Sequence, residues 1–408
     1  MVDAAATGTE GLRGRNRQDA HSSRSLRGGL QSCRARLAAV RQDRSTVRSA
    51  CRGGRAARGR EPRSQGARLV TARELCAARR NDGRCRPGAA RVKVLVTGAD
   101  GFVGRWLIRR LLDDGREVYG AVRPSEPQRE DGLTPEERAC VRWLPLEITD
   151  SESVRQCVDL PYDAVVHLAA ISSGTVSLRD PGVAWDINAG GTARLVHVLA
   201  EARRRDQADP VVLVVSTGEV YGRGQSVPRR ETETPAPCSP YAASKLGAEV
   251  AALEAWRRSG LRVIVARSFA HTGPGQEAGF VIPAFAQRLL FAKKIGAPVV
   301  KVGNLEPVRD LLHVQDVVDA YVRLLRQGEA GEVYNIASGH GTRLEDVLFR
   351  MAELLGVRAI PEADPELMRP ADIPHLVGDG EKLRATTGWS PRRSLDDTLR
   401  DVLNAQTN

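Results

Sequence analysis

The sequence predicts an α/β protein: a doubly wound parallel sheet, a smaller C-terminal α/β domain for the substrate, and a disordered N-terminal extension. Three observations support this fold class. From residue 92 onward, short β-branched apolar runs alternate with stretches of helical period. A glycine-rich turn follows the first run, as in nucleotide-binding sheets. Near residue 90 the composition changes from an arginine-rich leader to a mixed globular sequence.

The leader holds the basic charge of the chain. Residues 1–90 contain 21 arginines, no lysine and seven acids, a net charge of +14. Of the total of +11, this leaves about −3 for residues 91–408. The leader has few large apolar residues and no sustained amphipathic period, so we expect it to be disordered.

Three explanations of the leader are open. It resembles an organellar transit peptide, and it could equally be an arginine arm that contacts nucleic-acid phosphates. A misassigned start codon is favoured, because arginine without lysine is typical of GC-rich DNA translated outside its frame. The mass of the N-terminus of the purified protein would distinguish them.

The first strand and the turn after it predict a dinucleotide site. The run VKVLV (92–96) is followed by TGADGFVG (97–104) and then by RWLIRRLLDDG (105–115), which has a helical period. Glycines in this spacing let the backbone approach a pyrophosphate, which then sits on the helix N-terminus. We therefore expect a Rossmann-type site with the cofactor-binding residues Gly98, Asp100, Gly101, Phe102, Val103 and Gly104.

The end of the next strand, EVYGAV (117–122), indicates which cofactor is bound. NAD-preferring folds usually place an acid there for the ribose 2′-hydroxyl, whereas this chain has Arg123, which suits a 2′-phosphate. We therefore expect NADP, with NAD as the alternative. Two later strands, ending in LEITD (146–150) and at VVHLAA (165–170), should complete the cofactor site with Glu147, Ile148, Leu168, Ala169 and Ala170.

Two signals 24 residues apart predict proton transfer. Thr217 lies in VSTGEVYG, and Tyr241 and Lys245 lie in YAASK. A tyrosine and a lysine four apart share one helix face, so the ammonium can lower the pKa of the phenol. A tyrosine tuned in this way can act as an acid or base on a substrate oxygen.

The motifs TGADGFVG, HLAA, STGEVYG and YAASK together resemble the extended short-chain dehydrogenases/reductases that act on nucleotide-diphosphate sugars. The resemblance covers residues 91 to about 405. It implies an enzyme in which Thr217 polarises the substrate, Tyr241 is the acid/base, and Lys245 binds the nicotinamide ribose. It also implies a Rossmann domain over residues 91–265 and a mainly substrate-binding domain over 266–408, interleaved with the first.

The C-terminal half is similar to the branch that handles GDP-6-deoxyhexoses. HTGPGQ (271–276) and the tail over 369–403 favour the GDP-4-keto-6-deoxymannose reductases over the GDP-mannose 4,6-dehydratases. The implied reaction is NADPH-dependent reduction of the C4 ketone to a GDP-6-deoxyhexose, with GDP-D-rhamnose as the expected product. Arg309 would hold the diphosphate or pair with Asp310. Asn188 would position a helix or contact the substrate.

Two departures from the family pattern keep other reactions open. Ala270 stands where the family usually has asparagine, and Gly218 stands where dehydratases of glucose nucleotides have aspartate. Glu219 is retained, and it could be a C5 base or a hydrogen-bond partner of a sugar hydroxyl. A 4,6-dehydratase and a C4 epimerase are therefore alternatives. A non-catalytic nucleotide sensor is the alternative of another class, although a sensor would need neither Tyr241 nor Lys245.

The remaining expectations concern partners and location. No apolar run approaches the ~18 residues of a membrane span, and no signal peptide is recognisable, so we expect a cytoplasmic protein without a membrane partner. The mildly acidic residues 91–408 argue against a specific nucleic-acid partner. We expect no metal site. Relatives often dimerise through two helices, here the one after HLAA and the one over 241–258, so a homodimer is expected.

Overall fold

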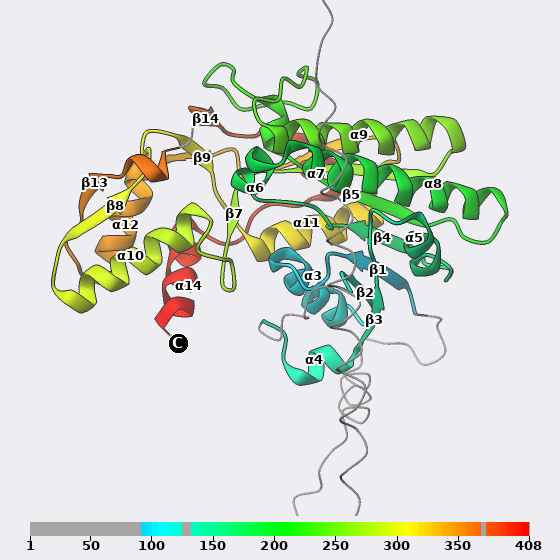
Figure 1. Cartoon of the computed structure of the whole chain (residues 1–408), viewed down its shortest axis with the longest axis horizontal. Helices are drawn as coiled ribbons and strands as arrows, with labels where there is room; N and C mark the ends of the chain where they lie inside the picture. The colour runs from blue at the N-terminus through cyan, green and yellow to red at the C-terminus, as the bar shows by residue number, and fades with distance from the viewer. Residues whose placement is uncertain (1–90, 125–131, 369–372, 408) are drawn as a thin grey trace, which may run out of the picture. The chain divides into compact units, whose positions relative to one another are not determined.

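The structure is a computed structural model that describes residues 91–124, 132–368 and 373–407. The expectations for residues 1–90, including the disordered extension, lie outside the described residues. Within the described part, a seven-stranded parallel sheet is flanked by helices (Figure 1), which confirms the predicted fold class.

The order of the strands places a ligand site at the carboxyl ends of β1 and β4. The sheet runs β11-β6-β5-β4-β1-β2-β3, and β1 pairs in parallel with both β2 and β4. The chain thus winds outward in two directions from this point, where open α/β sheets bind their ligands. The strands are β1 (Lys93–Thr97), β2 (Glu117–Val122), β3 (Val141–Pro145), β4 (Ala164–His167), β5 (Val211–Thr217), β6 (Arg262–Ser268) and β11 (Val333–Ile336).

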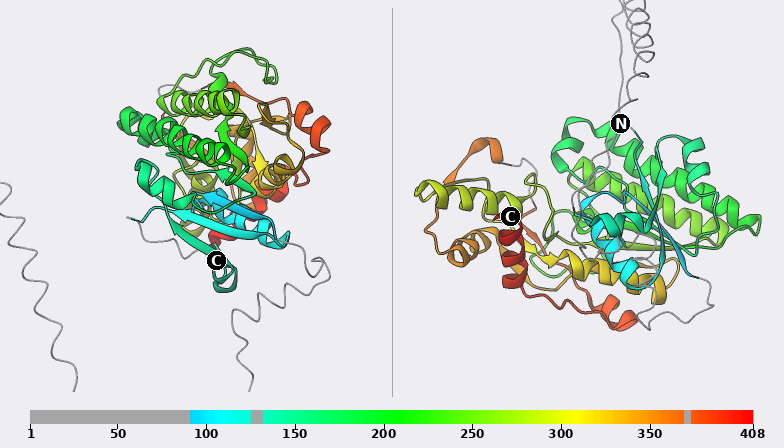
Figure 2. Two further views of the ribbon diagram at one scale, coloured as in Figure 1. Left: turned by 90° about the vertical axis from the view of Figure 1, so that its right-hand side faces the viewer. Right: turned by 90° about the horizontal axis from the view of Figure 1, so that it is seen from below.

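Two helical layers cover the sheet (Figure 2), and each has its own apolar core. Continuous β-branched runs such as VVLVVST in β5 suit strands that are buried on both faces. One layer holds α3 (Phe102–Asp113), α11 (Val314–Gln327) and α13 (Glu381–Thr387). The other holds α5 (Ser151–Cys157), α8 (Gly191–Arg204) and α9 (Pro240–Ser259).

Helix α9 carries the YAASK motif, and its ends are well defined by the sequence. The side chain of Ser239 accepts a hydrogen bond from the Ala242 N–H, and Pro240 occupies the first turn. At the other end Gly260 takes the left-handed conformation, with φ of 70°, that terminates a helix. The predicted helix over 241–258 is therefore confirmed, with one more residue at each end.

A smaller α/β unit is built from the C-terminal part of the chain. Helices α10 (Val281–Ile295), α12 (Leu344–Leu355) and α14 (Leu395–Thr407) pack around a separate apolar core with the parallel pair β8 (Val299–Val302) and β13 (Ile360–Ala363). Strand β11, α11 and α13 also follow residue 266 but pack with the large sheet.

The remaining described elements are short. They are α4 (Pro135–Ala139), α6 (Gly174–Arg179), α7 (Pro181–Trp185), η1 (Asp186–Gly190), η2 (Gly218–Tyr221), β7 (His271–Thr272), β9 (Val308–Asp310), β10 (Leu312–His313), β12 (Gly341–Arg343), η3 (Pro365–Leu367) and β14 (His375–Leu376).

Three elements differ from their predicted extent. The strand expected to end in LEITD (146–150) is β3, which ends at Pro145. The strand expected over 165–170 ends at His167, because the backbone N–H groups of Leu168 and Ala169 turn to the Thr97 hydroxyl, at 3.2 and 3.1 Å. The helix expected after HLAA and before the YAASK helix begins with the π-helical turn η1 before α8.

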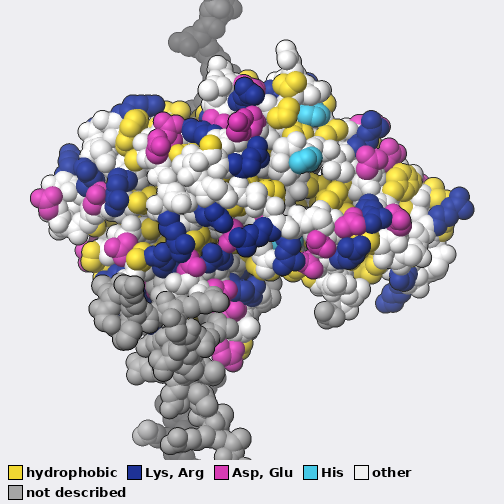
Figure 3. Space-filling model, turned by 180° about the vertical axis from the view of Figure 1, so that it is seen from behind, with side chains coloured by type: hydrophobic (Ala, Val, Ile, Leu, Met, Phe, Trp, Pro, Cys, Tyr) yellow, Lys and Arg dark blue, Asp and Glu magenta, His cyan; other side chains and the backbone are white. Residues whose placement is uncertain are grey.

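The surface charges and the composition of the helices concern possible nucleic-acid and membrane partners. Lys and Arg side chains are interspersed with Asp and Glu over the face drawn in Figure 3. Among the described helices, none is long and apolar enough to cross a membrane.

Candidate active site

A cavity of about 770 Å³ lies at the carboxyl ends of the central strands and reaches α10. It brings together residues from motifs that are far apart in the sequence. Every predicted cofactor, catalytic and substrate residue lines it, with the exception of Asn188. The predicted site residues therefore line a cavity at the carboxyl ends of β1 and β4, where the order of the strands places a ligand site.

The glycine-rich turn forms a cradle that side chains would fill. Gly98 has a φ of 66°, and a Cβ there would lie 2.9 Å from the backbone nitrogen of Ala169. A Cβ at Gly104 would lie 2.4 Å from the carbonyl oxygen of Gly98. Helix α3 begins directly after Gly101, which makes no side-chain cap, and first-turn N–H groups have no intrahelical partner. The turn therefore fits a dinucleotide pyrophosphate, which the helix N-terminus would stabilise.

The cavity continues past the ends of β2 and β3, where we expect the adenosine of the cofactor to bind. Arg123 is exposed and follows β2 directly. The carboxylate of Glu147 accepts a hydrogen bond from the Thr149 hydroxyl at 2.7 Å. Ile148 packs against Gly191, where a Cβ would come within 2.7 Å of its side chain. Leu168, Ala169 and Ala170 line the cavity just after β4.

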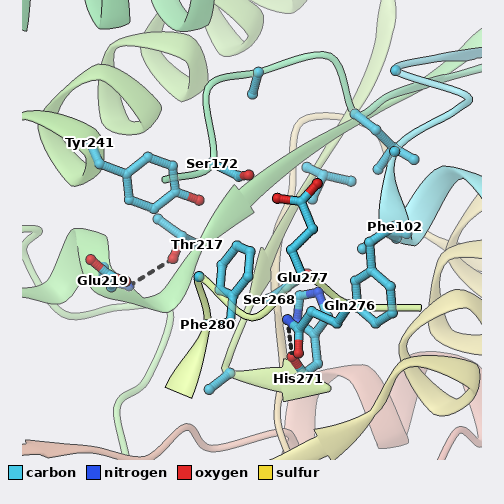
Figure 4. Close-up of a pocket in the computed structure, with 18 of the residues that line it drawn as sticks. Phe102, Ser172, Thr217, Glu219, Tyr241, Ser268, His271, Gln276, Glu277 and Phe280 are labelled. Carbon is cyan, nitrogen blue, oxygen red and sulfur yellow. Dashed lines mark hydrogen bonds between the residues drawn. The ribbon is translucent and has the colours of Figure 1, made fainter. Parts of the chain in front are cut away.

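The three predicted catalytic residues meet at one side of the cavity. Thr217 is the last residue of β5, and Tyr241 and Lys245 lie in the first two turns of α9. The Tyr241 phenol lies beside the Thr217 side chain (Figure 4). The Thr217 hydroxyl also accepts from the backbone N–H of Glu219 at 3.2 Å. Thr217 and Lys245 are only 8% and 5% exposed, so both side chains are shielded from bulk water.

The protonation of Tyr241 differs from the prediction. We expected Lys245 to lower the pKa of the phenol, but burial and the negative charge of Glu219 raise it above the usual value of ~10. The nearby Thr217 hydroxyl opposes this rise only in part. Burial lowers the pKa of Lys245 to about 8. At neutral pH the phenol is therefore protonated, as a proton donor must be, and the ammonium of Lys245, one helical turn further along α9, is charged.

Asn188 lies in η1, outside the cavity lining, and is 1% exposed. Its Oδ1 accepts from the backbone N–H of Ile171 at 2.8 Å, and its Nδ2 donates to the Ile171 carbonyl and to the Ser244 hydroxyl. Ser244 in turn donates to the carbonyl of Tyr241 at 2.8 Å. Asn188 thus ties the loop after β4 to the start of α9, as a helix-positioning group would.

Replacing Asn188 by Ala should lower the free energy of unfolding by about 2–3 kcal/mol, because buried hydrogen-bonding groups lose their partner. Binding of GDP should stay within about twofold, a change of under ~0.5 kcal/mol. Denaturant unfolding and titration calorimetry measure the two effects, with the exposed Asn404→Ala in α14 as the control. Unchanged stability together with weaker GDP binding would instead make Asn188 a substrate contact.

Sequence reasoning missed several lining residues that come from the segment after β6. The His271 ring stacks on Phe102, with centroids 6.3 Å apart, and burial lowers the pKa of its imidazole. Gln276 donates to the carbonyl of His271 at 3.2 Å (Figure 4). The run HTGPGQ was the available signal for both residues. Ala270 also lines the cavity, as do Ser172, Glu277, Phe280, Arg288, Asn304 and Tyr321.

Arg309 lines the cavity from β9 and donates to the backbone carbonyls of Val308 and Ile373, at 3.0 and 2.7 Å. The carboxylate of its neighbour Asp310 is fully buried, and it accepts hydrogen bonds from the backbone of Ser338, Gly339 and Gly378. Asp310 thereby holds the loops beside Arg309.

Comparisons with known proteins agree with this geometry. Residues 95–402 match the family model described as GDP-mannose 4,6 dehydratase. GDP-6-deoxy-D-mannose reductase from Pseudomonas aeruginosa is 36% identical over 315 residues, which cover 76% of this chain and 96% of the relative.

Two solved structures show the same likeness. RMD from Pseudomonas aeruginosa complexed with NADPH has a TM-score of 0.65 at 32% identity, and the match covers 77% of this chain and 98% of that chain. The UDP-glucose 4-epimerase of Thermus thermophilus in complex with NAD has a TM-score of 0.67 at 28% identity, covering 78% and 99%. The predicted resemblance to NAD(P)-dependent nucleotide-sugar enzymes is confirmed, and the chain belongs to the GDP-mannose 4,6 dehydratase family.

Proposed function

We propose that the protein reduces the C4 ketone of GDP-4-keto-6-deoxy-D-mannose with NADPH. The expected product is a GDP-6-deoxyhexose, GDP-D-rhamnose. The similarity to a GDP-6-deoxy-D-mannose reductase, with 96% of that relative covered, supports the reaction class. The NADPH complex of a similar structure and the position of Arg123 support the cofactor.

One observation favours reduction over dehydration. Expelling water across C5 and C6 of the sugar requires an acid as well as a base. Gly218 offers no acid, and a Cβ there would lie 2.9 Å from the ring of Phe269. Phe269 is 2% exposed and packs in a small core with Tyr221, so it cannot readily move aside. The position beside Thr217 is therefore closed to a second acid.

The residues of the cavity have separate roles in this reaction. The cradle at Gly98, Gly101 and Gly104 would hold the pyrophosphate of NADPH, which supplies the hydride when bound. Thr217 donates a hydrogen bond to the C4 oxygen, and Tyr241 gives that oxygen its proton. The charged Lys245 stabilises the phenolate that remains. Arg309 would bind the diphosphate of the substrate, as a planar guanidinium does well.

Replacing Arg123 by Glu should reverse the cofactor preference. A carboxylate would repel the 2′-phosphate of NADPH and accept from the 2′-hydroxyl of NADH. We expect the ratio of kcat/KM for NADPH over NADH to fall about 100-fold, or ~2.7 kcal/mol. Steady-state kinetics with both cofactors measure it, and Arg142→Glu, on the exposed part of β3, is the matched control. An unchanged ratio would remove Arg123 from the cofactor site.

A 4,6-dehydratase is the second candidate, because Glu219 lines the cavity and its charge acts on Tyr241. The two are separated by supplying GDP-mannose, a known dehydratase and NADPH, then following NADPH absorbance and identifying the sugar. Consumption of NADPH with formation of a GDP-6-deoxyhexose supports the reductase. Ketone formation from GDP-mannose by this protein alone, without NADPH consumption, would refute it.

Assembly and location are further expectations. A homodimer through α8 and α9 is supported by apolar side chains on that side of the molecule, where Trp185 is 46% and Val250 is 60% exposed. Light scattering on the purified protein tests the homodimer. A cytoplasmic location, and the absence of nucleic-acid and membrane partners, stay predictions.

A further inference from the structure

A buried charged network lies beneath the catalytic residues and joins α9, β5 and β6. Glu249 and Arg267 are 1% and 5% exposed. The guanidinium of Arg267 donates to the carboxylate of Glu249 through Nε, at 3.0 Å, and through Nη2, at 2.7 Å. The hydroxyl of Ser216 donates to the same carboxylate. Arg267 also lies 4.8 Å from the ring centre of Tyr221.

Each member of the network is next to a residue of the site. Glu249 follows Lys245 by four positions, so the two share one face of α9. Ser216 precedes Thr217, and in the β5–β6 register Ser216 lies opposite Arg267. Neither Glu249 nor Arg267 lines the cavity, so any effect on the reaction must pass through their neighbours.

Stability alone is a poor reason for such a network. A buried ion pair often contributes no more than apolar side chains of similar volume, because both charges lose their hydration. A fixed carboxylate one helical turn from a buried ammonium does have an electrostatic effect, since charges interact strongly away from water. The geometry thus gives Glu249 a second role besides pairing with Arg267.

We propose that Glu249 is a positioning residue that acts through Lys245 and keeps its ammonium charged. Arg267 and Ser216 hold the carboxylate in place for this purpose. The inference rests on the proposed function, in which a charged Lys245 supports proton transfer from Tyr241, and it adds a residue that acts from behind the site.

The other titratable groups around Lys245 leave Glu249 as the source of the effect. Burial lowers the pKa of His167 to about 3 and raises the pKa of Tyr241, Tyr221 and Tyr321, so all four are neutral at pH 7. Glu219 acts electrostatically on Tyr241. The side chains of the neighbouring α7–α8 segment are at least 31% exposed and screened by water, namely Asp186, Arg194, His197 and Glu201.

The proposal predicts that removing Glu249 and removing Arg267 shift the pKa of Lys245 in opposite directions. Burial lowers the pKa of Lys245 to about 8, and the charge of Glu249 opposes that fall. Lys245 is charged below this pH and loses its proton as the pH rises through it. Without the charge of Glu249, deprotonation should occur at lower pH. Without Arg267 the carboxylate is no longer neutralised, so deprotonation should occur at higher pH.

The test measures the ionisation of Lys245 directly. Acetic anhydride acylates only the neutral amine, and peptide mass spectrometry gives the rate at Lys245 against pH in the absence of cofactor and substrate. At pH 7, Glu249→Gln should raise this rate at least about threefold, and Arg267→Met should lower it by a similar factor, since each half-unit change in pKa is about threefold. The alkaline limb of kcat/KM should shift in the same directions.

Matched variants separate positioning from a structural role. Glu254→Gln removes another glutamate of α9, paired with Arg258 at the surface, and should leave the Lys245 rate unchanged. Glu249→Asp keeps the charge and should keep the rate near that of the wild type. If Glu249→Gln does not fold, the double variant Glu249→Gln/Arg267→Met removes the whole pair and should still show the faster acylation.

An unchanged Lys245 rate in the folded variants would overturn the proposal and leave Glu249 as a partner of Arg267 only. Loss of folding in both the single and the double variant would do the same. Because acylation needs no substrate, this result is independent of whether the enzyme reduces GDP-4-keto-6-deoxy-D-mannose.

Discussion

Replacing Tyr241 by Phe is expected to lower kcat by about 10³–10⁴-fold, near the upper range for loss of a general acid. The change removes only the phenolic hydroxyl, and it leaves the ring that lines the cavity. The affinity for NADPH should therefore stay within about threefold, or ~0.7 kcal/mol. Stopped-flow turnover and fluorescence titration with NADPH measure the two quantities.

Tyr321→Phe is the matched control for this result. Tyr321 lines the same cavity, is fully buried, and shares a hydrogen bond of 2.8 Å with Ser268. Loss of the Tyr321 hydroxyl should lower kcat by less than about tenfold, because one neutral hydrogen bond contributes only ~1 kcal/mol. Substantial turnover in Tyr241→Phe, or equal losses in both variants, would show that Tyr241 is not the proton donor.

The parts of the site that are predictable from sequence are those encoded locally. The GxxGxxG spacing between a strand and a helix dictates close backbone approach, and the structure shows it at Gly98 and Gly104. Likewise Tyr241 and Lys245 are one helical turn apart, so their common face follows from the period of α9 alone. The fold class follows from the same periodicities.

Residues that reach the site through long-range packing are not predictable in this way. His271 and Phe280 line the cavity because the chain after β6 folds back over the N-terminus of α3, where His271 meets Phe102. The direction of the Tyr241 pKa shift also depends on such packing. Burial and the charge of Glu219 in η2 raise this pKa, and the YAASK motif contains neither cause.

Gly104→Ala is expected to weaken NADPH binding about 100-fold. A Cβ at this position would lie 2.4 Å from the carbonyl oxygen of Gly98, and 2.6 Å from that of Ala99. Both are backbone atoms of the turn, so the turn itself must move away from the start of α3. Loss of two charge-assisted hydrogen bonds to the pyrophosphate, at about 1.5 kcal/mol each, corresponds to about this factor.

Gly174→Ala is the control for the added methyl group. Gly174 begins α6, and a Cβ there would meet nothing within 4 Å, so NADPH binding should not change. Gly104 faces backbone rather than flexible side chains, and its substitution cannot be absorbed by a rotamer change. Fluorescence titration of both variants with NADPH, with thermal unfolding to verify the fold, makes the comparison. Wild-type affinity in a folded Gly104→Ala protein would mean that the pyrophosphate does not sit in this cradle.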